Sequence, residues 1–224
     1  MTARDAVEAF EAVEPGRPAV RGVLHRPARP SSDGVVLTHG AGGNRDAPIL
    51  IALATAFAAR GLTVLRCDLP YRQAHPKGPP PAASAARDRE GLRQAMLALR
   101  RLASGRLHVG GLSYGGRQAS MLAAGEPGLA DGLLLLSYPL HPPGRPSELR
   151  TAHLPALSAP ALFVHGSADP FGSIEELEAA RTLVPAPTAL VVVEGGHDLG
   201  LSRLRRRAPD VTDRIVAAFL RLMG

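Results

Sequence analysis

The sequence has little that would support a disulfide-bonded, membrane-spanning or aromatic-rich protein. It contains one cysteine, Cys67, and no tryptophan, and aromatic residues make up 4% of its 224 residues. A single cysteine excludes an intramolecular disulfide, which suits a reducing compartment. No apolar run is long enough to cross a bilayer, and Asp5 and Glu8 stand where a secretory signal would have an apolar core. We therefore expect a cytoplasmic protein with no membrane partner.

Lysine is nearly absent as well. Lys77 is the only lysine, so arginine supplies almost all of the positive charge behind the formal net charge of +6. Abundant alanine and proline suggest that this bias reflects coding composition more than a polyanionic partner. One local cluster stands out, at Arg203, Arg205, Arg206 and Arg207, but no aromatic residues are interleaved with it. We expect a solvated loop there and no nucleic-acid partner; nucleic-acid binding through this cluster is the alternative.

Short apolar runs alternate with helix-like stretches along the chain. At 224 residues and 45% hydrophobic content, the chain can form one α/β domain, over residues 1–224, with a substantial core. The alternation is typical of a parallel sheet covered by helices on both faces. The expected strands are residues 34–39, 62–67, 107–112, 132–137, 161–165 and 189–194. The expected helices are residues 48–60, 84–102, 114–124, 174–183 and 210–223.

Two proline-rich connections interrupt this alternation. Residues 73–83 favour an extended loop, and residues 139–160 contain six prolines and room for at most one helical turn. The second connection is too short for a multi-helix lid, so we expect an open site. Near the N-terminus, residues 3–13 form either a helical turn or an edge strand, and residues 19–25 form a short strand against it.

The strongest chemical signal is a G-x-S-x-G pattern centred on Ser113, with Gly111 and Gly115 on either side. Between a strand and a helix, this pattern holds the serine in a strained turn with its hydroxyl above the sheet. A β-carbon at either glycine would strike the neighbouring backbone. Free N–H groups at the start of the helix would face any charge that forms there. Taken alone, the pattern also fits a glycine-rich turn with a surface serine.

A serine hydroxyl needs a base, and the base needs a third group to orient it. Asp169 and His197 each lie a few residues beyond an expected strand, and they follow Ser113 in the order that this architecture requires. The alternatives are a turn or N-cap aspartate and a loop histidine. Asp68 and Asp198 are weaker candidates for the acid, because one precedes the serine and the other adjoins the histidine. The pattern predicts a catalytic triad of Ser113, Asp169 and His197.

Acyl transfer also requires backbone N–H groups that stabilise the negative charge on the carbonyl oxygen. One donor is expected at Tyr114, directly after the serine. The other is expected at Ala41, in the glycine-rich loop that follows the strand 34–39. Other polar residues fall on loops at the same sheet edge. The candidate substrate contacts among them are Tyr71, Arg72, Tyr138 and His141.

Arg117 falls in the first turn of the helix behind the serine, where the helix dipole disfavours a cation. An ion pair with Asp88 is the first interpretation, and contact with a substrate carboxylate is the second. None of the 8 histidines belongs to an H-E-x-x-H motif or a Cys/His cluster. The sequence therefore predicts no metal site and implies no cofactor.

Together these segments resemble the α/β-hydrolase superfamily over nearly the whole chain. Four of them resemble one branch: Thr-His-Gly-Ala-Gly at 38–42, Gly-Gly-Arg at 115–117, Tyr-Pro-Leu-His-Pro-Pro-Gly at 138–144 and Asp-Pro-Phe-Gly at 169–172. That branch holds the testis-expressed and NSL-complex-subunit-3 hydrolase-like proteins with their bacterial relatives, close to the dienelactone hydrolases. Dienelactone hydrolases use a cysteine nucleophile where this chain has Ser113, so the resemblance does not carry over their substrate.

We therefore predict an α/β-hydrolase fold with a mostly parallel central sheet, helices on both faces and minimal or no lid. The predicted reaction is hydrolysis of a small ester or thioester through an acyl-enzyme. Ser113 attacks, His197 moves the proton and Asp169 orients the imidazole. The alternative, which the eukaryotic branch members allow, is a catalytically silent interaction protein. The sequence does not determine the acyl and alcohol groups or the oligomeric state.

Overall fold

The computed structural model of the protein describes residues 5–200 and 208–224, so the arginine cluster at 203–207 lies outside the described residues. The strands are β1 Ala6–Ala12, β2 Val20–Arg26, β3 Gly34–Thr38, β4 Thr63–Asp68, β5 Leu107–Leu112, β6 Gly132–Leu136, β7 Ala161–Gly166 and β8 Thr188–Val193. The helices are α1 Pro48–Ala58, α2 Pro70–Ala74, α3 Ala85–Arg100, α4 Tyr114–Gly125, α5 Ile174–Arg181 and α6 Ala208–Met223.

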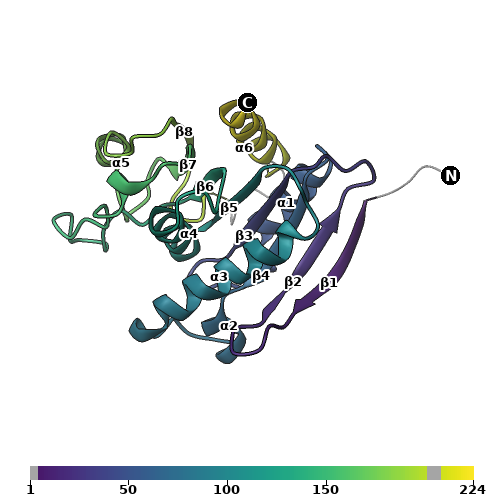
Figure 1. Ribbon diagram of the computed structural model, residues 1–224. Helices are drawn as coiled ribbons and strands as arrows, with labels where there is room; N and C mark the ends of the chain where they lie inside the picture. Colours follow the sequence, from purple (N-terminus) through teal and green to yellow (C-terminus); the bar gives the residue numbers. More distant parts are fainter. Residues whose placement is uncertain (1–4, 201–207) are drawn as a thin grey trace.

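The strands form one eight-stranded sheet in the order β1-β2-β4-β3-β5-β6-β7-β8 (Figure 1). β3 to β8 pair in parallel, whereas β2 pairs antiparallel with both β1 and β4. Because parallel strands end at the same edge, the loops after β3, β5, β7 and β8 gather there. The prediction of a mostly parallel, helix-covered sheet is confirmed.

Alternation along the strands divides the core into two layers. In β6, Leu133 and Leu135 pack into a cluster with residues of α3, α4 and α5, whereas Leu134 and Leu136 pack into a second cluster with α1 and α6. Figure 1 shows α3 and α4 across the near side of the sheet. A strand buried on both faces is apolar throughout, which explains the run of four leucines in β6.

The N-terminal segment and the connection after β4 complete the comparison with the expected elements. Residues 3–13 left two possibilities open, and β1 is an edge strand. The helix α2 was not predicted; it begins at Pro70, which has no N–H to leave unpaired in a first turn. The connection 139–160 contains only the 3-10 turn Leu154–Ala156, as the prolines predicted. Over the described ranges no lid covers the sheet edge.

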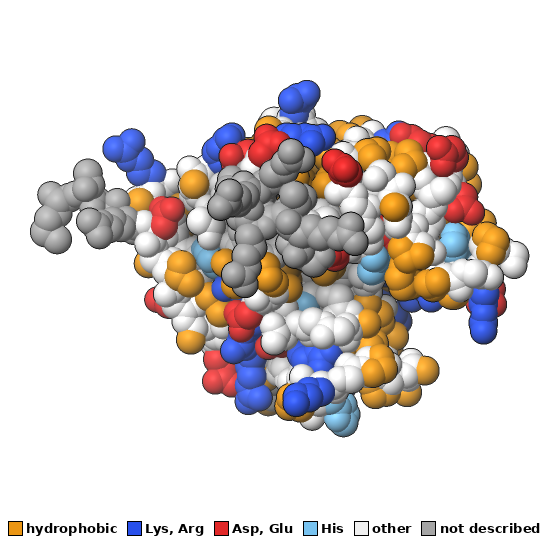
Figure 2. Space-filling model, turned by 180° about the vertical axis from the view of Figure 1, so that it is seen from behind, with side chains coloured by type: hydrophobic (Ala, Val, Ile, Leu, Met, Phe, Trp, Pro, Cys, Tyr) orange, Lys and Arg blue, Asp and Glu red, His pale blue; other side chains and the backbone are white. Residues whose placement is uncertain are grey.

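Charged side chains of both signs are interspersed on the face drawn in Figure 2. Surface ion pairs hold many of the arginines, for example Arg93 with Glu126 and Arg181 with Glu178. No helix in residues 5–200 and 208–224 has the length and apolar character needed to cross a bilayer.

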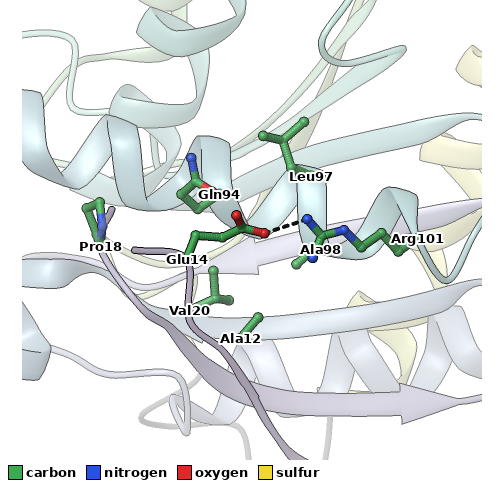
Figure 3. Close-up of a pocket in the computed structure, with 8 residues that line it drawn as sticks. All are labelled: Ala12, Glu14, Pro18, Val20, Gln94, Leu97, Ala98 and Arg101. Atoms are coloured by element: carbon green, nitrogen blue, oxygen red, sulfur yellow. Dashed lines mark hydrogen bonds and ion pairs between the residues drawn. The ribbon is translucent and has the colours of Figure 1, made fainter. Parts of the chain in front are cut away.

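A small cleft lies between the β1–β2 connection and α3, where Glu14 pairs with Arg101 (Figure 3). Ala12 and Val20 line it from the strands and Leu97 from the helix. Its volume of about 10 Å³ is close to that of one water molecule. We therefore treat it as a packing gap and not as a ligand site.

The only cysteine, Cys67, is buried in β4. Burial raises the pKa of its thiol to about 12. Because a thiol must lose its proton to act as a nucleophile, Cys67 is unreactive at neutral pH. The expectation that it serves in core packing is confirmed.

Two buried histidines make the free energy of unfolding depend on pH. Burial lowers the pKa of His108 to about 4, and burial together with Arg66 lowers that of His25 to about 4. In the unfolded chain both titrate near pH 6.5, so between about pH 6.5 and 4 the unfolded state binds more protons. Stability is therefore complete above that window and is lost as the pH falls through it, by at most about 1.4 kcal/mol per pH unit for each histidine.

We expect His108→Asn to reduce the slope of this dependence by the contribution of one histidine, measured by urea unfolding at about pH 7, 6 and 5. His75→Asn, at an exposed loop position, is the control and should keep the wild-type slope. A wild-type slope in His108→Asn would show that this ring does not carry the effect.

Candidate active site

Ser113 stands in a sharp turn between β5 and α4. Its φ is 50°, a left-handed conformation that non-glycine residues rarely adopt. Its N–H donates to Leu136 O over 2.7 Å, and its carbonyl accepts from Arg117 N over 2.9 Å. These bonds hold the strained residue between the end of β6 and the first turn of α4. The strained turn predicted from the G-x-S-x-G pattern is confirmed.

The two glycines of the pattern are required by the close approach of backbone segments. A β-carbon at Gly111 would lie 2.6 Å from Thr38 O, and one at Gly115 would lie 2.5 Å from His39 O. Both distances are far below van der Waals contact. The expectation that any side chain here would strike its neighbours is therefore confirmed, and the turn sits directly against the end of β3.

The structure brings Ser113, His197 and Asp169 together. His197 Nε2 lies 2.7 Å from Ser113 Oγ, and His197 Nδ1 lies 2.8 Å from Asp169 Oδ2. The Asp169 side chain is fully buried, whereas the imidazole remains partly exposed. With its proton on Nδ1, the imidazole donates to the carboxylate and accepts from the hydroxyl. This is the arrangement that activates a serine for attack.

Backbone bonds between two loops position the acid and the base. Ala168 N donates to Gly195 O over 2.8 Å, so the loop after β7 is fastened to the loop after β8. Asp169 Oδ1 also accepts from Phe171 N over 2.9 Å. The Phe171 ring packs against the imidazole of His197, with centroids 4.1 Å apart. These contacts restrict the imidazole to the orientation that faces Ser113.

The glycine-rich loop after β3 passes close to the serine. A β-carbon at Gly40 would lie 3.6 Å from Ser113 Cβ. Ala41 and Tyr114 both border the same hollow as Ser113. Both residues therefore lie beside the serine, and the assignment of their N–H groups as oxyanion donors stays a prediction.

Tyr71 and Arg72 hold this loop by its carbonyl groups. The Tyr71 hydroxyl lies 3.1 Å from Gly40 O and 2.9 Å from Ala41 O, and Arg72 Nη2 donates to Ala41 O over 2.8 Å. Both side chains are almost entirely buried, at 3% and 6% exposure. We correct the expectation that they contact substrate, because their polar groups are directed at the loop backbone.

Tyr138 and His141 make their polar contacts with the connection after β6 and with α5. The Tyr138 hydroxyl donates to Arg150 O over 2.7 Å, and His141 contacts Pro142 O and Glu176. Among the described residues, neither lines a hollow that borders Ser113. Their expected contact with substrate is corrected as well.

Asp88, which the sequence analysis paired with Arg117, accepts hydrogen bonds from three other groups in the interior. We call this buried set of contacts the Asp88 junction. Asp88 is 0% exposed, and its carboxylate accepts from Tyr71 N, Ser84 Oγ and the Tyr114 hydroxyl over 2.9, 2.9 and 2.8 Å. Within the described residues it forms no ion pair with Arg117. That expectation is wrong, because three other donors already satisfy the carboxylate.

Ser113 lies between two hollows, and Ala41 and Phe171 border both of them. The first hollow, of about 540 Å³, is lined in addition by Pro79, Pro80, Pro81, Ala82, Ala85, Tyr114, Arg117, Pro139 and Arg150. The second hollow, of about 450 Å³, is lined in addition by Gly40, Gly42, Gly43, Leu112, His197 and Asp198. In the described part of the chain, no group of three or more metal-binding side chains gathers.

The sequence missed Arg150 and Phe171 as site residues. Phe171 belongs to the Asp-Pro-Phe-Gly segment that follows β7, so a signal was present. Arg150 comes from the proline-rich connection and has no motif around it. Only the folded loops bring these two side chains to a hollow that Ser113 also lines.

The comparisons with known proteins agree with this architecture. Residues 31–223 match the family described as alpha/beta hydrolase domain. The chain belongs to this family. Similar solved structures include a dienelactone hydrolase from Anabaena variabilis, with 22% identity, a TM-score of 0.74, and 97% of this chain and 98% of that chain covered.

Two further structures are similar over almost the same length. One is an alpha-beta serine hydrolase homologue from Coxiella burnetii, with 18% identity, a TM-score of 0.73, and 94% of this chain and 96% of that chain covered. The other is an α/β serine hydrolase without a lid from Xanthomonas campestris, with 17% identity, a TM-score of 0.71, and 99% and 96% covered. At these identities the likeness establishes a common fold.

The Asp88 junction predicts a large loss of stability on truncation. Asp88→Ala leaves the Tyr71 N–H and the Tyr114 and Ser84 hydroxyls without their acceptor, and we expect it to lower the free energy of unfolding by about 2–4 kcal/mol. Glu148→Ala, which removes an exposed partner of Arg145, is the control and should cost about 0.5 kcal/mol or less. Urea unfolding measures both; similar values for the two variants would contradict the assigned role.

Proposed function

We propose that this member of the alpha/beta hydrolase domain family is a serine hydrolase that cleaves a small ester or thioester. The observation that carries the proposal is the hydrogen-bonded chain from Ser113 Oγ through His197 to Asp169, with distances of 2.7 and 2.8 Å. The similar structures described as a serine hydrolase and a dienelactone hydrolase support the same reaction class.

In the proposed reaction, His197 Nε2 takes the proton of Ser113 as the oxygen attacks the carbonyl carbon. The charge that develops on the carbonyl oxygen is stabilised by the N–H groups of Ala41 and Tyr114, where one such donor is worth about 10²–10³-fold in rate. Asp169 stabilises the imidazolium. His197 then protonates the leaving alcohol or thiol, and a water molecule that it activates hydrolyses the acyl-enzyme.

The donors are effective only if the loop is held in place before substrate binds. Tyr71 and Arg72 hold Ala41 by hydrogen bonds to its carbonyl oxygen. Asp88 accepts hydrogen bonds from both Tyr71 and Tyr114. We therefore assign Tyr71, Arg72 and Asp88 as positioning residues. The open edge beside Ser113 favours small or exposed substrates. The narrower placement beside the NSL-complex-subunit-3-like proteins, and a cytoplasmic location, remain part of the proposal.

A fluorophosphonate probe separates this proposal from a catalytically silent interaction protein. The probe should label the wild type and Cys67→Ala equally, and Ser113→Ala should not be labelled. On a panel of short 4-nitrophenyl esters and acyl-CoAs, Ser113→Ala should lose about 10³-fold or more in kcat. Absence of labelling in folded wild type, confirmed by circular dichroism, would favour the silent protein.

Tyr71→Phe tests the support of the oxyanion loop. Loss of the hydroxyl bonded to Gly40 O and Ala41 O should lower kcat about 10-fold with little change in KM, because the donors act mainly in the transition state. Ser31→Ala, which removes a surface hydroxyl bonded to Gly61 O, is the control and should match the wild type. A change in KM alone would instead indicate direct contact with substrate.

A further inference from the structure

Two arginines border the first hollow without a carboxylate partner in residues 5–200 and 208–224. They are Arg117, from the first turn of α4, and Arg150, from the connection after β6. Some other arginines do have such partners, as Arg93 has Glu126. The hollow beside Ser113 therefore concentrates positive charge that the described part of the protein does not neutralise.

The position of Arg117 is unfavourable unless a ligand compensates for it. Its Nε is buried and has no hydrogen-bond partner. It also lies at the end of α4 where the helix dipole is positive, so the dipole repels its charge. Burial and the nearby charge of Arg117 lower the pKa of Arg150. An orphaned buried donor and two like charges cost free energy, and a bound anion would offset the repulsion between the two charges.

Two ionisable side chains that interact with the arginines are neutral at neutral pH, and the acidic one, Glu148, is exposed and paired with another arginine. Burial raises the pKa of Tyr138 to about 12, so its hydroxyl stays neutral. Burial and Arg117 lower the pKa of His153 to about 4, so its ring stays neutral too. Glu148 favours the charged form of Arg150 and so raises its pKa, but Glu148 is exposed and pairs with Arg145. The counter-charge has to come from the ligand.

The location of His197 decides which part of a substrate enters this hollow. His197 lines the second hollow and not the first. Because it gives its proton to the leaving oxygen or sulfur, the leaving group has to lie on its side of Ser113. The acyl group then extends on the other side, toward Arg117 and Arg150.

We propose that the first hollow binds an acyl group with a carboxylate at its far end, held by Arg117 and Arg150. The substrate would thus be a monoester or monothioester of a dicarboxylic acid. The inference rests on the proposed serine hydrolase function and specifies its substrate class. Guanidinium groups match the geometry of a carboxylate. The proline and alanine walls, Pro79 to Ala82 and Ala85, suit an apolar chain between the two carbonyl carbons.

A matched pair of chromogenic esters tests the proposal. The 4-nitrophenyl monoester of adipic acid and 4-nitrophenyl hexanoate have acyl chains of equal length and differ in the terminal carboxylate. In wild type, kcat/KM should be about 10-fold or more higher for the adipate ester, and added salt should reduce the preference. Arg117→Gln and Arg150→Gln should each lower the ratio of the two kcat/KM values about 10-fold.

Arg145→Gln is the matched control, because Arg145 lies in the same connection but is exposed and lines neither hollow. It should leave the ratio and the basal activity unchanged. Ser113-dependent cleavage of both esters with a ratio near one, or a ratio that survives both arginine substitutions, would overturn the carboxylate subsite and leave the serine hydrolase intact.

A second pair of esters tests the assignment to the acyl side. Phenyl hexanoate and 4-carboxyphenyl hexanoate carry the charge difference in the leaving group. An arginine-dependent preference for the second would overturn that assignment. If none of the four esters is cleaved and the fluorophosphonate does not label Ser113, the proposed function itself fails and this inference fails with it.

Discussion

The close contact between the end of β3 and the β5–α4 turn is the constraint on which the rest of the site depends. Gly111 and Gly115 allow the two backbones to touch, and Ser113 takes a left-handed conformation between them. Because β3 and β5 are neighbours in the sheet, the loop after β3 has to pass beside the serine. One packing requirement thus sets the positions of the hydroxyl and of the candidate oxyanion donors together.

A second set of contacts, centred on Asp88 and Tyr71, holds the loops around the site in place. Asp88, in α3, accepts from donors in α2, at Ser84 just before α3, and at the start of α4. The hydroxyl of Tyr71, whose N–H donates to Asp88, in turn contacts the carbonyl groups of Gly40 and Ala41. A fully buried carboxylate is costly unless its acceptor sites are filled, and here three donors fill them. The buried polar contacts therefore fix the relative positions of these segments.

In contrast to Asp88, the two arginines at the first hollow lack a partner for their charge among the described residues. Arg117 and Arg150 carry like charges into a partly buried space without a carboxylate partner among the described residues. Local destabilisation of this kind is common where a protein is shaped for a ligand. The hollows on the two sides of Ser113 also differ in character, one basic and the other bordered by glycines and His197. On the proposal that Arg117 and Arg150 bind the acyl group, this asymmetry gives a bound ester a direction.

Local patterns in the sequence determined the alternation of strands and helices, the turn at Ser113, and the order in which Asp169 and His197 follow it. They did so because burial on both faces, tight turns and strand ends each impose residue types on short segments. Side-chain direction was decided by the tertiary structure alone. The Tyr71 hydroxyl bonds to a loop carbonyl 30 residues away in the sequence. Arg117 lines a hollow, whereas the sequence suggested that it pairs with Asp88. Such choices depend on which distant donors and acceptors are already satisfied, and no local pattern records that.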